Sequence, residues 1–409
     1  MLNIIWAGFF IFAAIAAVIR SFSGHFEVWP QMLNSLFDSA QSGFEISLNL
    51  TGLLCFWLGL MKIAEKSGLA NGLAKILTPL FYRIMPEVPH NSPAFGSMVM
   101  NIAANILGLD NAATPMGLKA MEQLQQDNKH KDRASDAQIL FMVINSSAVT
   151  LIPITILMYR YQFGSVNPAA VFIPILLATS VSTLTGFLAT LLWQRINLFD
   201  KVILAYLLGG IGIISAAACG FSALDASARE QVSYLGSNFI LFALIIAFIV
   251  SGIVKRLNVY ELFIIGAKDG FKTAVQIIPY LVAMLAAIGI FRASGGLDFI
   301  CTGLSYLFNT LGFDTSFIPA LPTALMKPLS GSGARAMMLD CFSAYGVDSF
   351  AGFAASVVQG STETTFYVLA VYFGAVKISK TGAALPLALL ADMAGIIAAI
   401  SFAYMFYQE

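Results

Sequence analysis

Hydrophobic residues in this chain are grouped into runs about as long as a membrane helix, and short polar segments separate the runs. An α-helix needs about 20 consecutive, mainly apolar residues to cross a bilayer. Nine runs reach roughly this length, at about residues 2–20, 45–64, 138–160, 169–193, 201–219, 235–254, 274–292, 352–375 and 383–407. The pattern predicts an all-α polytopic membrane protein, and we expect the N-terminal run to be its first span.

Two further apolar runs, 94–107 and 318–326, are too short to cross a bilayer. Each is followed by a polar break that contains glycine and then by a second helix-like segment. A helix that enters the membrane, breaks and returns is a re-entrant hairpin, which is tolerated where protein or water covers its free backbone groups. We expect two such hairpins, with their tips at 108–115 and 327–333.

The two hairpins fall at corresponding places in an internal duplication. The 39 residues "GFEISLNLTGLLCFWLGLMKIAEKSGLANGLAKILTPLF", from Gly43, align without a gap with "GFKTAVQIIPYLVAMLAAIGIFRASGGLDFICTGLSYLF", from Gly270. The alignment also pairs Ser67 with Ser294. Further along, "VINSSAVTLIP" falls opposite "VVQGSTETTFY", so two of the long runs carry a polar break at matching positions. The alternative is that any two membrane segments rich in Leu and Gly align to some extent.

The distribution of basic residues predicts the orientation of the repeats. If the N-terminus lies in the cytoplasm, most Lys and Arg residues also fall on that side, as the positive-inside rule requires. The run at 201–219 is an odd span between the halves, so the second half must run in the opposite direction. We therefore predict inverted repeats over 1–200 and 201–409, in the bacterial inner (cytoplasmic) membrane. Inverted repeats with discontinuous helices are typical of secondary transporters.

Four polar clusters would then meet near the middle of the bilayer and form a candidate substrate-binding site. The cluster at the first tip is Asp110, Asn111 and Thr114, and the one at the second tip is Lys327, Ser330, Ser332 and Arg335. The clusters at the two breaks are Asn145, Ser146, Ser147 and Thr150, and Gln359, Ser361, Thr362, Glu363 and Thr364. Broken helices also point their positive N-terminal ends at such a site and attract anionic or hydrogen-bond-accepting groups.

The charged members of these clusters need partners, water or a ligand, because a charge at mid-bilayer costs about 2.5–3.5 kcal/mol even on a lenient scale. We expect Glu363 to pair with Arg335, either as a static pair that fixes the hairpin or as part of a transport cycle. Glu363 is also the candidate for coupling to a proton or cation, since a low dielectric raises the pKa of a lone carboxyl group. A further interpretation of Ser330 and Ser332 is that they cap the helix that follows them.

Composition excludes several classes of function. The chain has 409 residues, of which 58% are hydrophobic and 11% charged, and its 22 basic residues balance 22 acidic ones. Nucleic-acid binding depends on clustered positive charge, which is absent here, so we expect no nucleic-acid partner. The four Cys and three His residues show no metal-ligand spacing. There is no Walker A, HExxH or GxSxG motif, so we expect neither an enzyme nor a cofactor.

Three longer stretches carry a family resemblance. "NILGLDNAATPMGLKAMEQLQ" in the first half resembles the spore maturation protein A family. "MKPLSGSGARAMMLD" and "VVQGSTETTFYVLAVYFGAVKI" in the second half resemble spore maturation protein B. The chain thus resembles a fusion of two such gate repeats, one in each half. Both parts are similar to the nucleoside recognition, or gate, domain, and hence distantly to concentrative nucleoside transporters and to the membrane part of ferrous iron transporter B.

This resemblance implies inverted repeats with helical hairpins, and it allows a homo-oligomer. The chain lacks the GTPase domain of the iron transporter, and no motif carries over the nucleoside-reading residues. We therefore expect a secondary transporter or exporter of a small polar metabolite, nucleoside-like or amino-acid-like, that works by an elevator-type movement. The alternative is a membrane scaffold or assembly factor of the spore maturation type, which does not transport.

Overall fold

The computed structural model describes residues 2–147, 151 and 153–407, and it describes only the backbone of residues 2, 110–112, 226, 227 and 230. Helices dominate this part of the chain. The helices of the first half are α1 (Leu2–Phe22), α2 (Val28–Asn49), α3 (Thr51–Ser67), α4 (Leu69–Ile84), α5 (Ala94–Ile106), α6 (Asp110–Asp127), α7 (Asp136–Ser146), α8 (Ile154–Gln162), η1 (Pro168–Val171) and α9 (Phe172–Trp193). The helices of the second half are α10 (Lys201–Ser222), α11 (Ala226–Val254), α12 (Val259–Ala293), α13 (Gly296–Thr310), η2 (Ile318–Ala320), α14 (Leu321–Met326), α15 (Gly331–Tyr345), α16 (Phe350–Gly360), α17 (Thr365–Ala375) and α18 (Ala384–Phe406).

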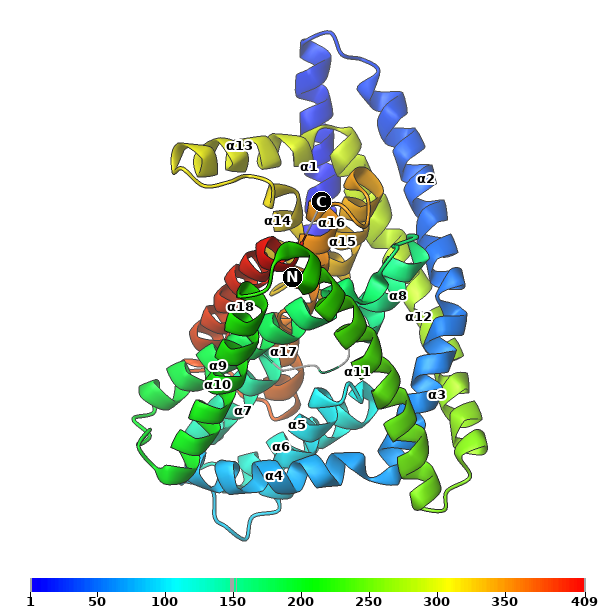
Figure 1. Cartoon of the computed structure of the whole chain (residues 1–409). Helices are drawn as coiled ribbons and strands as arrows, with labels where there is room; N and C mark the ends of the chain where they lie inside the picture. The colour runs from blue at the N-terminus through cyan, green and yellow to red at the C-terminus, as the bar shows by residue number, and fades with distance from the viewer. Residues whose placement is uncertain (1, 148–150, 152, 408–409) are drawn as a thin grey trace.

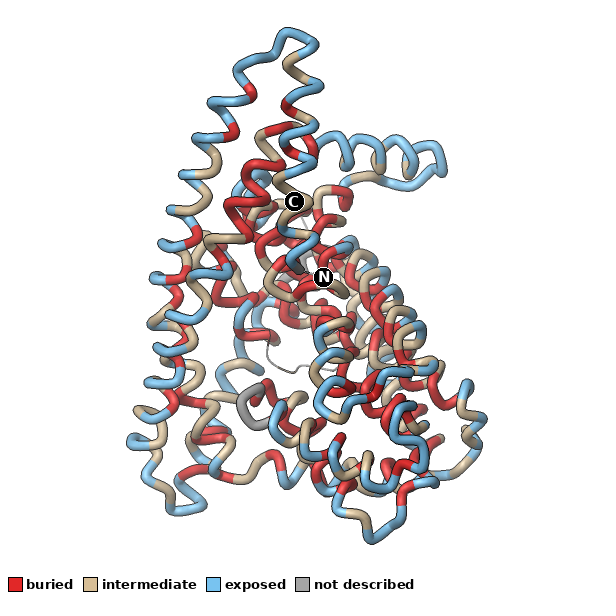
Figure 2. The backbone as a smooth tube through the Cα atoms, turned by 180° about the vertical axis from the view of Figure 1, so that it is seen from behind, coloured by how far each residue is buried: buried red, intermediate tan, exposed pale blue. Residues whose placement is uncertain are grey.

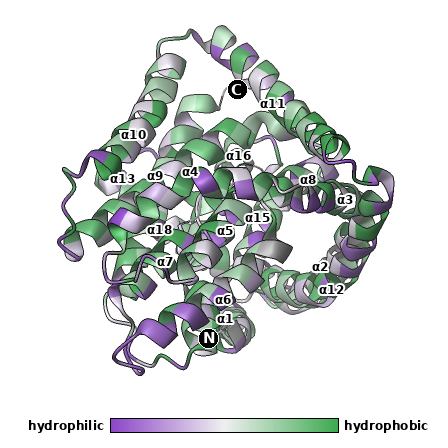
Figure 3. Cartoon of the chain, turned by 90° about the horizontal axis from the view of Figure 1, so that it is seen from below, coloured by the Kyte–Doolittle hydropathy of each residue, from purple (hydrophilic) through white to green (hydrophobic). Residues whose placement is uncertain are grey.

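The helices confirm an all-α polytopic membrane protein. In the described part of the chain, six helices are long and apolar enough to cross a membrane: α1, α9 with η1, α10, α11, α12 and α18. The pair α2 and α3, bent by 40°, makes a seventh candidate. The remaining two predicted spans are the polar-broken ones, now the pairs α7–α8 and α16–α17. Hydrophobic residues predominate on peripheral helices such as α10 and α11, as a lipid-facing surface requires (Figure 3).

Three long helices form a frame along one side of the molecule. The frame consists of α2, α3 and α12, and Figure 1 shows α12 running antiparallel to the other two. A Cβ built on Gly43 would lie 3.0 Å from the backbone of Val282, and one built on Gly270 would lie 2.6 Å from Cα of Cys55. Glycines at such positions let membrane helices approach closely.

These two contacts are equivalent under the internal repeat. The gapless alignment pairs Gly43 with Gly270 and Cys55 with Val282, so each glycine packs on the residue that corresponds to the other glycine's partner. A reciprocal contact of this kind is what a two-fold relation between antiparallel helices produces. Moreover, α4 and α13, which follow the frame helices in the two halves, lie across opposite ends of the molecule (Figure 1). The predicted inverted repeats are confirmed, whereas the boundary between residues 200 and 201 stays a prediction.

The second group of helices, here called the core, consists of α5–α9 and α14–α18. Its helices α9 and α18 pack on each other, the two broken spans pack against this pair, and each hairpin packs on a broken span. Figure 2 shows that buried residues are concentrated in this part of the molecule, while the hairpin of α1 and the first part of α2 rises above it and is mostly exposed.

Both hairpin tips are shorter than the sequence predicted. The first turn occupies only 107–109, where Gly108 takes a φ of +72°, and α6 begins at Asp110 rather than after Pro115. The expectation was wrong because Asp and Asn favour the first turn of a helix, so this polar segment begins α6 instead of interrupting it. The second turn occupies 327–330, because α15 already begins at Gly331.

Candidate functional site

Backbone hydrogen bonds hold each broken span to the hairpin tip of its own half. The amide of Leu151 donates to the carbonyl of Ile106 over 2.8 Å, and the amide of Phe366 donates to the carbonyl of Pro328 over 3.0 Å. A third bond joins the two halves, from the amide of Glu363 to the carbonyl of Ser146 over 2.9 Å. These bonds satisfy backbone groups that the breaks leave free, as a bilayer interior demands.

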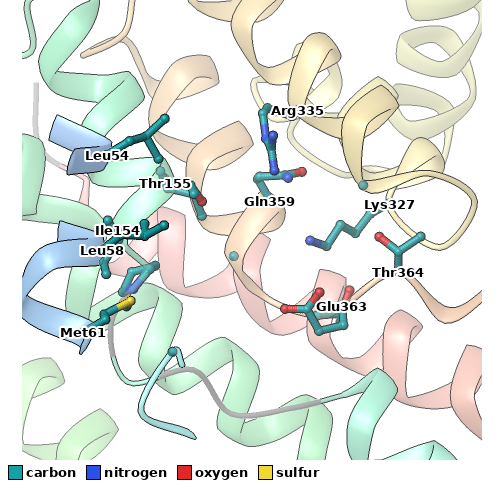
Figure 4. A pocket seen from close by; sticks show the side chains of 16 residues that line it. Leu54, Leu58, Met61, Ile154, Thr155, Lys327, Arg335, Gln359, Glu363 and Thr364 are labelled. Atoms are coloured by element: carbon teal, nitrogen blue, oxygen red, sulfur yellow. The ribbon is translucent and has the colours of Figure 1, made fainter. Parts of the chain in front are cut away.

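A cavity of about 220 Å³ opens where the core meets the frame. The residues that line it are Leu54, Leu58, Met61, Gly108, Pro153, Ile154, Thr155, Ile156, Lys327, Gly331, Arg335, Gln359, Gly360, Thr362, Glu363 and Thr364. Figure 4 shows the apolar side chains of α3 on one side and the charged and amide side chains of the second half on the other. The cavity is thus bounded by frame and core together.

A second cavity, of about 210 Å³, adjoins the first and extends along α3. Both cavities are lined by Leu54, Leu58, Met61, Gly108, Thr155 and Arg335. The second also reaches Lys62 and Glu65, near the end of α3, and Asp269 on α12. The shared lining places the two cavities side by side between the centre of the protein and one end of the frame.

The charged residues of the cavity are Lys327, Arg335 and Glu363. Lys327 is only 5% exposed. Within the described residues, its ammonium has no hydrogen bond and no ion pair within 4.0 Å, and Figure 4 shows it pointing toward Glu363. The expected ion pair between Arg335 and Glu363 is not present. Instead, the Arg335 guanidinium lies over the ring of Tyr159, 5.7 Å from its centroid.

Three helices begin at the cavity wall. α15 begins at Gly331, α17 at Thr365 after the lining residue Thr364, and α8 at Ile154. The cavity therefore lies at three N-terminal helix ends, which carry partial positive charge.

Ser330 caps α15, as its side-chain oxygen accepts a hydrogen bond from the amide of Gly333 over 3.1 Å. Ser332 lies 3.2 Å from Ser330, hydroxyl to hydroxyl. Neither serine lines the cavity, although Gly331 between them does. A Cβ on Gly331 would lie 2.8 Å from the hydroxyl of Thr364, so glycine there lets the second tip close onto the second break.

Asn145 belongs to a hydrogen-bond network that joins the two halves. Its side-chain oxygen accepts bonds from Asn105 over 2.8 Å and from the hydroxyl of Tyr372 over 3.1 Å. Asn101 in turn donates to the Tyr372 hydroxyl over 3.2 Å. The network ties α5 and α7 of the first half to α17 of the second, so Asn145 holds elements together and does not line the cavity.

The other predicted site residues are divided between the cavity and the helix interiors. Of the residues predicted at the second break, Gln359, Thr362, Glu363 and Thr364 line the cavity. Three buried serines bond to carbonyls one turn earlier in their own helices, and they are Ser146, Ser147 and Ser361. Thr114 is exposed on α6 and is not among the lining residues. The side chains of Asp110 and Asn111, and the whole of Thr150, lie outside the described residues.

Asp392 is a buried carboxylate that the sequence reasoning missed. It lies on α18 and is 1% exposed. One of its oxygens accepts a bond from the Thr365 hydroxyl over 2.7 Å, whereas the other has no partner within the described residues. The hydroxyl of Thr362, on the same break, interacts with this carboxylate without meeting strict hydrogen-bond geometry. The signal was available, since a lone Asp within the apolar run at 383–407 is expensive unless it has a function.

Comparison with known proteins adds to this geometry. The family model described as nucleoside recognition, Gate, matches this chain twice, over residues 47–162 and 274–379. The chain belongs to this family. Each match contains a frame helix in whole or in part, one hairpin and one broken span, so the unit that the family model describes coincides with the repeat seen in the structure.

Two curated relatives are similar to this Gate protein. Spore maturation protein B of Bacillus subtilis (strain 168) is 50% identical over 149 residues, which cover 36% of this chain and 82% of that protein. Spore maturation protein A of the same organism is 37% identical over 182 residues, which cover 44% of this chain and 90% of that protein. The resemblance to both relatives is thereby confirmed. No solved structure matches the chain.

Proposed function

We propose that this Gate protein is a secondary transporter or exporter of a small polar metabolite, nucleoside-like or amino-acid-like, that works by alternating access. The observation that carries the proposal is the position of the polar cavity, between α3 of the frame and the hairpins and broken spans of the core. A solute held there would change sides if the core moved against the frame, as in transporters built from inverted repeats.

We propose further that Glu363 couples transport to a proton or cation. Glu363 lines the cavity, where a solute or an ion can reach it. Its backbone amide is bonded to Ser146, whereas its carboxylate has no hydrogen bond or ion pair within 4.0 Å among the described residues, although Lys327 acts on it at longer range. Such a carboxylate can gain and lose a cation without unfolding the break.

Solute flux into proteoliposomes tests the coupling. Wild type and Glu363→Gln are compared with and without a proton or sodium gradient, on a solute that stabilises the purified protein. Gradient-driven accumulation should fall at least tenfold in the variant, while exchange without a gradient should persist. If both proteins accumulate the solute equally, Glu363 has no coupling role. Glu261→Gln is the matched control, because Glu261 lies on α12, away from the cavity.

A second candidate function is a membrane scaffold or assembly factor that does not transport. The observation that favours it is an ion pair between frame and core, in which the Arg292 guanidinium of α12 donates to both carboxylate oxygens of Asp340 of α15, over 2.8 and 3.0 Å from Nε. This ion pair would oppose movement of the core along the frame. A scaffold should show no thermal stabilisation by any member of a metabolite panel, whereas the substrate of a transporter should stabilise it by mass action.

The proposal extends to the membrane in which the protein lies and to its assembly. We propose a bacterial inner-membrane protein with a cytoplasmic N-terminus, and a homo-oligomer embedded in lipid. Basic residues at the α3–α4 end of the frame, among them Lys62, Lys66 and Lys75, support this orientation. Labelling of an N-terminal cysteine tag in intact cells tests it, because a membrane-impermeant reagent should react only after the membrane is opened.

A further inference from the structure

We propose that the solute bound in the central cavity carries an anionic group, a carboxylate or a phosphate, held between Lys327 and Arg335. The inference rests on the proposed function and narrows its substrate class. It disfavours neutral nucleosides, which cannot balance the charge of this site.

Lys327 is the first reason for an anion. Lys327 is 5% exposed, and within the described residues its ammonium makes no hydrogen bond and no ion pair within 4.0 Å. The carboxylates of Glu363 and Asp392 act on it only at longer range. Lysine is almost never fully buried unless it is paired. Its side chain lines the cavity, so the missing partner can be a group that occupies the cavity.

Arg335 is the second reason. Its guanidinium lies over the face of the Tyr159 ring, and its planar set of N–H donors has no hydrogen-bond partner among the described residues. A guanidinium presents five donors in a fixed fork, and this fork matches the two oxygens of a carboxylate or phosphate. Arg335 lines both cavities, so it stands on the path of the solute.

The charges around the cavity are a third reason for an anion. Among the lining residues, Lys327 and Arg335 are opposed by one carboxylate, Glu363. Asp392 also acts on Lys327 electrostatically, but it is buried and does not line the cavity. The N-terminal ends of α8, α15 and α17 add partial positive charges at the same wall. One anionic group on the solute would pair with the two cationic side chains that face the cavity, and Glu363 would remain available to a cation or a donor.

Matched pairs of probes test the inference on the full-length protein in detergent. Each pair differs in one anionic group, which one member carries and its neutral partner lacks: adenosine 5′-phosphate and adenosine, butyrate and butyramide, N-acetylleucine and N-acetylleucinamide. The charged member of at least one pair should raise the melting temperature increasingly with its concentration, and its neutral partner should not. A positive phosphate pair alone assigns a phosphate, and a positive butyrate or N-acetylleucine pair assigns a carboxylate. Stabilisation by neutral members equal to that by charged ones, or by no charged member, overturns the inference.

Two variants then assign the effect to the named residues. Lys327→Met and Arg335→Gln should each weaken binding of the charged probe at least tenfold, since a hydrogen bond to a charged group contributes about 1.5–3 kcal/mol. Lys75→Met is the control, because Lys75 is exposed on α4, away from the cavity. Wild-type affinity in both cavity variants overturns the inference.

A measurement without ligand keeps the test independent of the panel. If the Lys327 ammonium is unpaired, Lys327→Met should melt at the same temperature as the wild type or higher, because a buried charge has been removed. A lower melting temperature would mean that Lys327 is a structural partner of Glu363, and the inference would fail. Failure of the proposed function looks different, since charged probes would then bind but would not be transported in proteoliposomes.

Discussion

Replacing Gly270 by alanine tests the close packing of the frame and, with it, the two-fold relation between the repeats. The new Cβ would lie 2.6 Å from both Cα of Cys55 and the carbonyl oxygen of Leu54. Carbon atoms in favourable contact are about 3.5–4.0 Å apart, so α3 and α12 would have to separate by about 1 Å. Overpacking of this kind costs about 1–3 kcal/mol.

The substitution also has a favourable effect that a control can measure. Alanine stabilises a helix interior by about 0.8–1.0 kcal/mol relative to glycine. Gly52 lies on α3 of the same frame, and a Cβ there would meet nothing within 4 Å, so Gly52→Ala should show this gain alone. We therefore expect Gly270→Ala to be less stable than Gly52→Ala by about 1–3 kcal/mol. Gly43→Ala should fall between them, since its closest contact is 3.0 Å.

The assay is equilibrium unfolding in detergent micelles, with the free energy extrapolated linearly from the denaturant titration. The three variants are compared with the wild type under one set of conditions, so that the micelle contributes equally to all of them. If Gly270→Ala unfolds with the same free energy as Gly52→Ala, the two frame helices do not approach each other as closely as the structure shows, and the reciprocal contact loses its meaning.

Two other predictions concern carboxylates outside the cavity. Asp392→Asn should unfold with an equal or higher free energy than the wild type, because the amide still accepts from Thr365 and no buried charge remains. Thr365→Val should lose about 1.5–3 kcal/mol, as it removes the hydrogen bond that Asp392 accepts over 2.7 Å. The reverse order in denaturant titrations would contradict this. The hydrogen bond and charge of Lys380, 2.8 Å away, lower the pKa of Asp132 below its ordinary value. This ionised contact contributes above the ordinary pKa and is lost as the pH falls through the lowered one. Carboxyl NMR should therefore give Asp132 a low midpoint in the wild type and a higher one, closer to the ordinary value, in Lys380→Met. Equal midpoints would exclude the contact in solution.

Much of the fold could be predicted because its determinants are local in the sequence. The lengths of the apolar runs predicted the membrane spans, and the polar residues within two runs predicted the broken helices. The gapless alignment predicted the internal repeats. The tips were placed too broadly, since a polar stretch such as the one that begins at Asp110 reads equally well as a loop or as the first turn of a helix. Only the structure separates these two outcomes.

The sequence predicted the charged wall of the cavity but not its apolar wall on α3. Lys327, Arg335 and Glu363 stand out because charge is rare in a membrane span. Leu58 and its neighbours on α3 form the opposite wall, and nothing in an apolar helix marks one leucine as facing a cavity. The sequence could not predict which charges pair, because a contact between Arg335 and Glu363 depends on the directions of side chains on α15 and on the break between α16 and α17.

The bonds among Asn145, Tyr372 and the asparagines of α5 have a consequence for how the protein can move. Tyr372 comes from the second repeat, yet its hydroxyl is held by two side chains of the first. Addition of a Cβ at Gly117 would collide with that hydroxyl, so the tyrosine has little room to swing away. Two gates that open in turn would need halves that move independently, and these hydrogen bonds oppose such movement while they are made. If the proposed transport takes place, the two repeats should therefore move together.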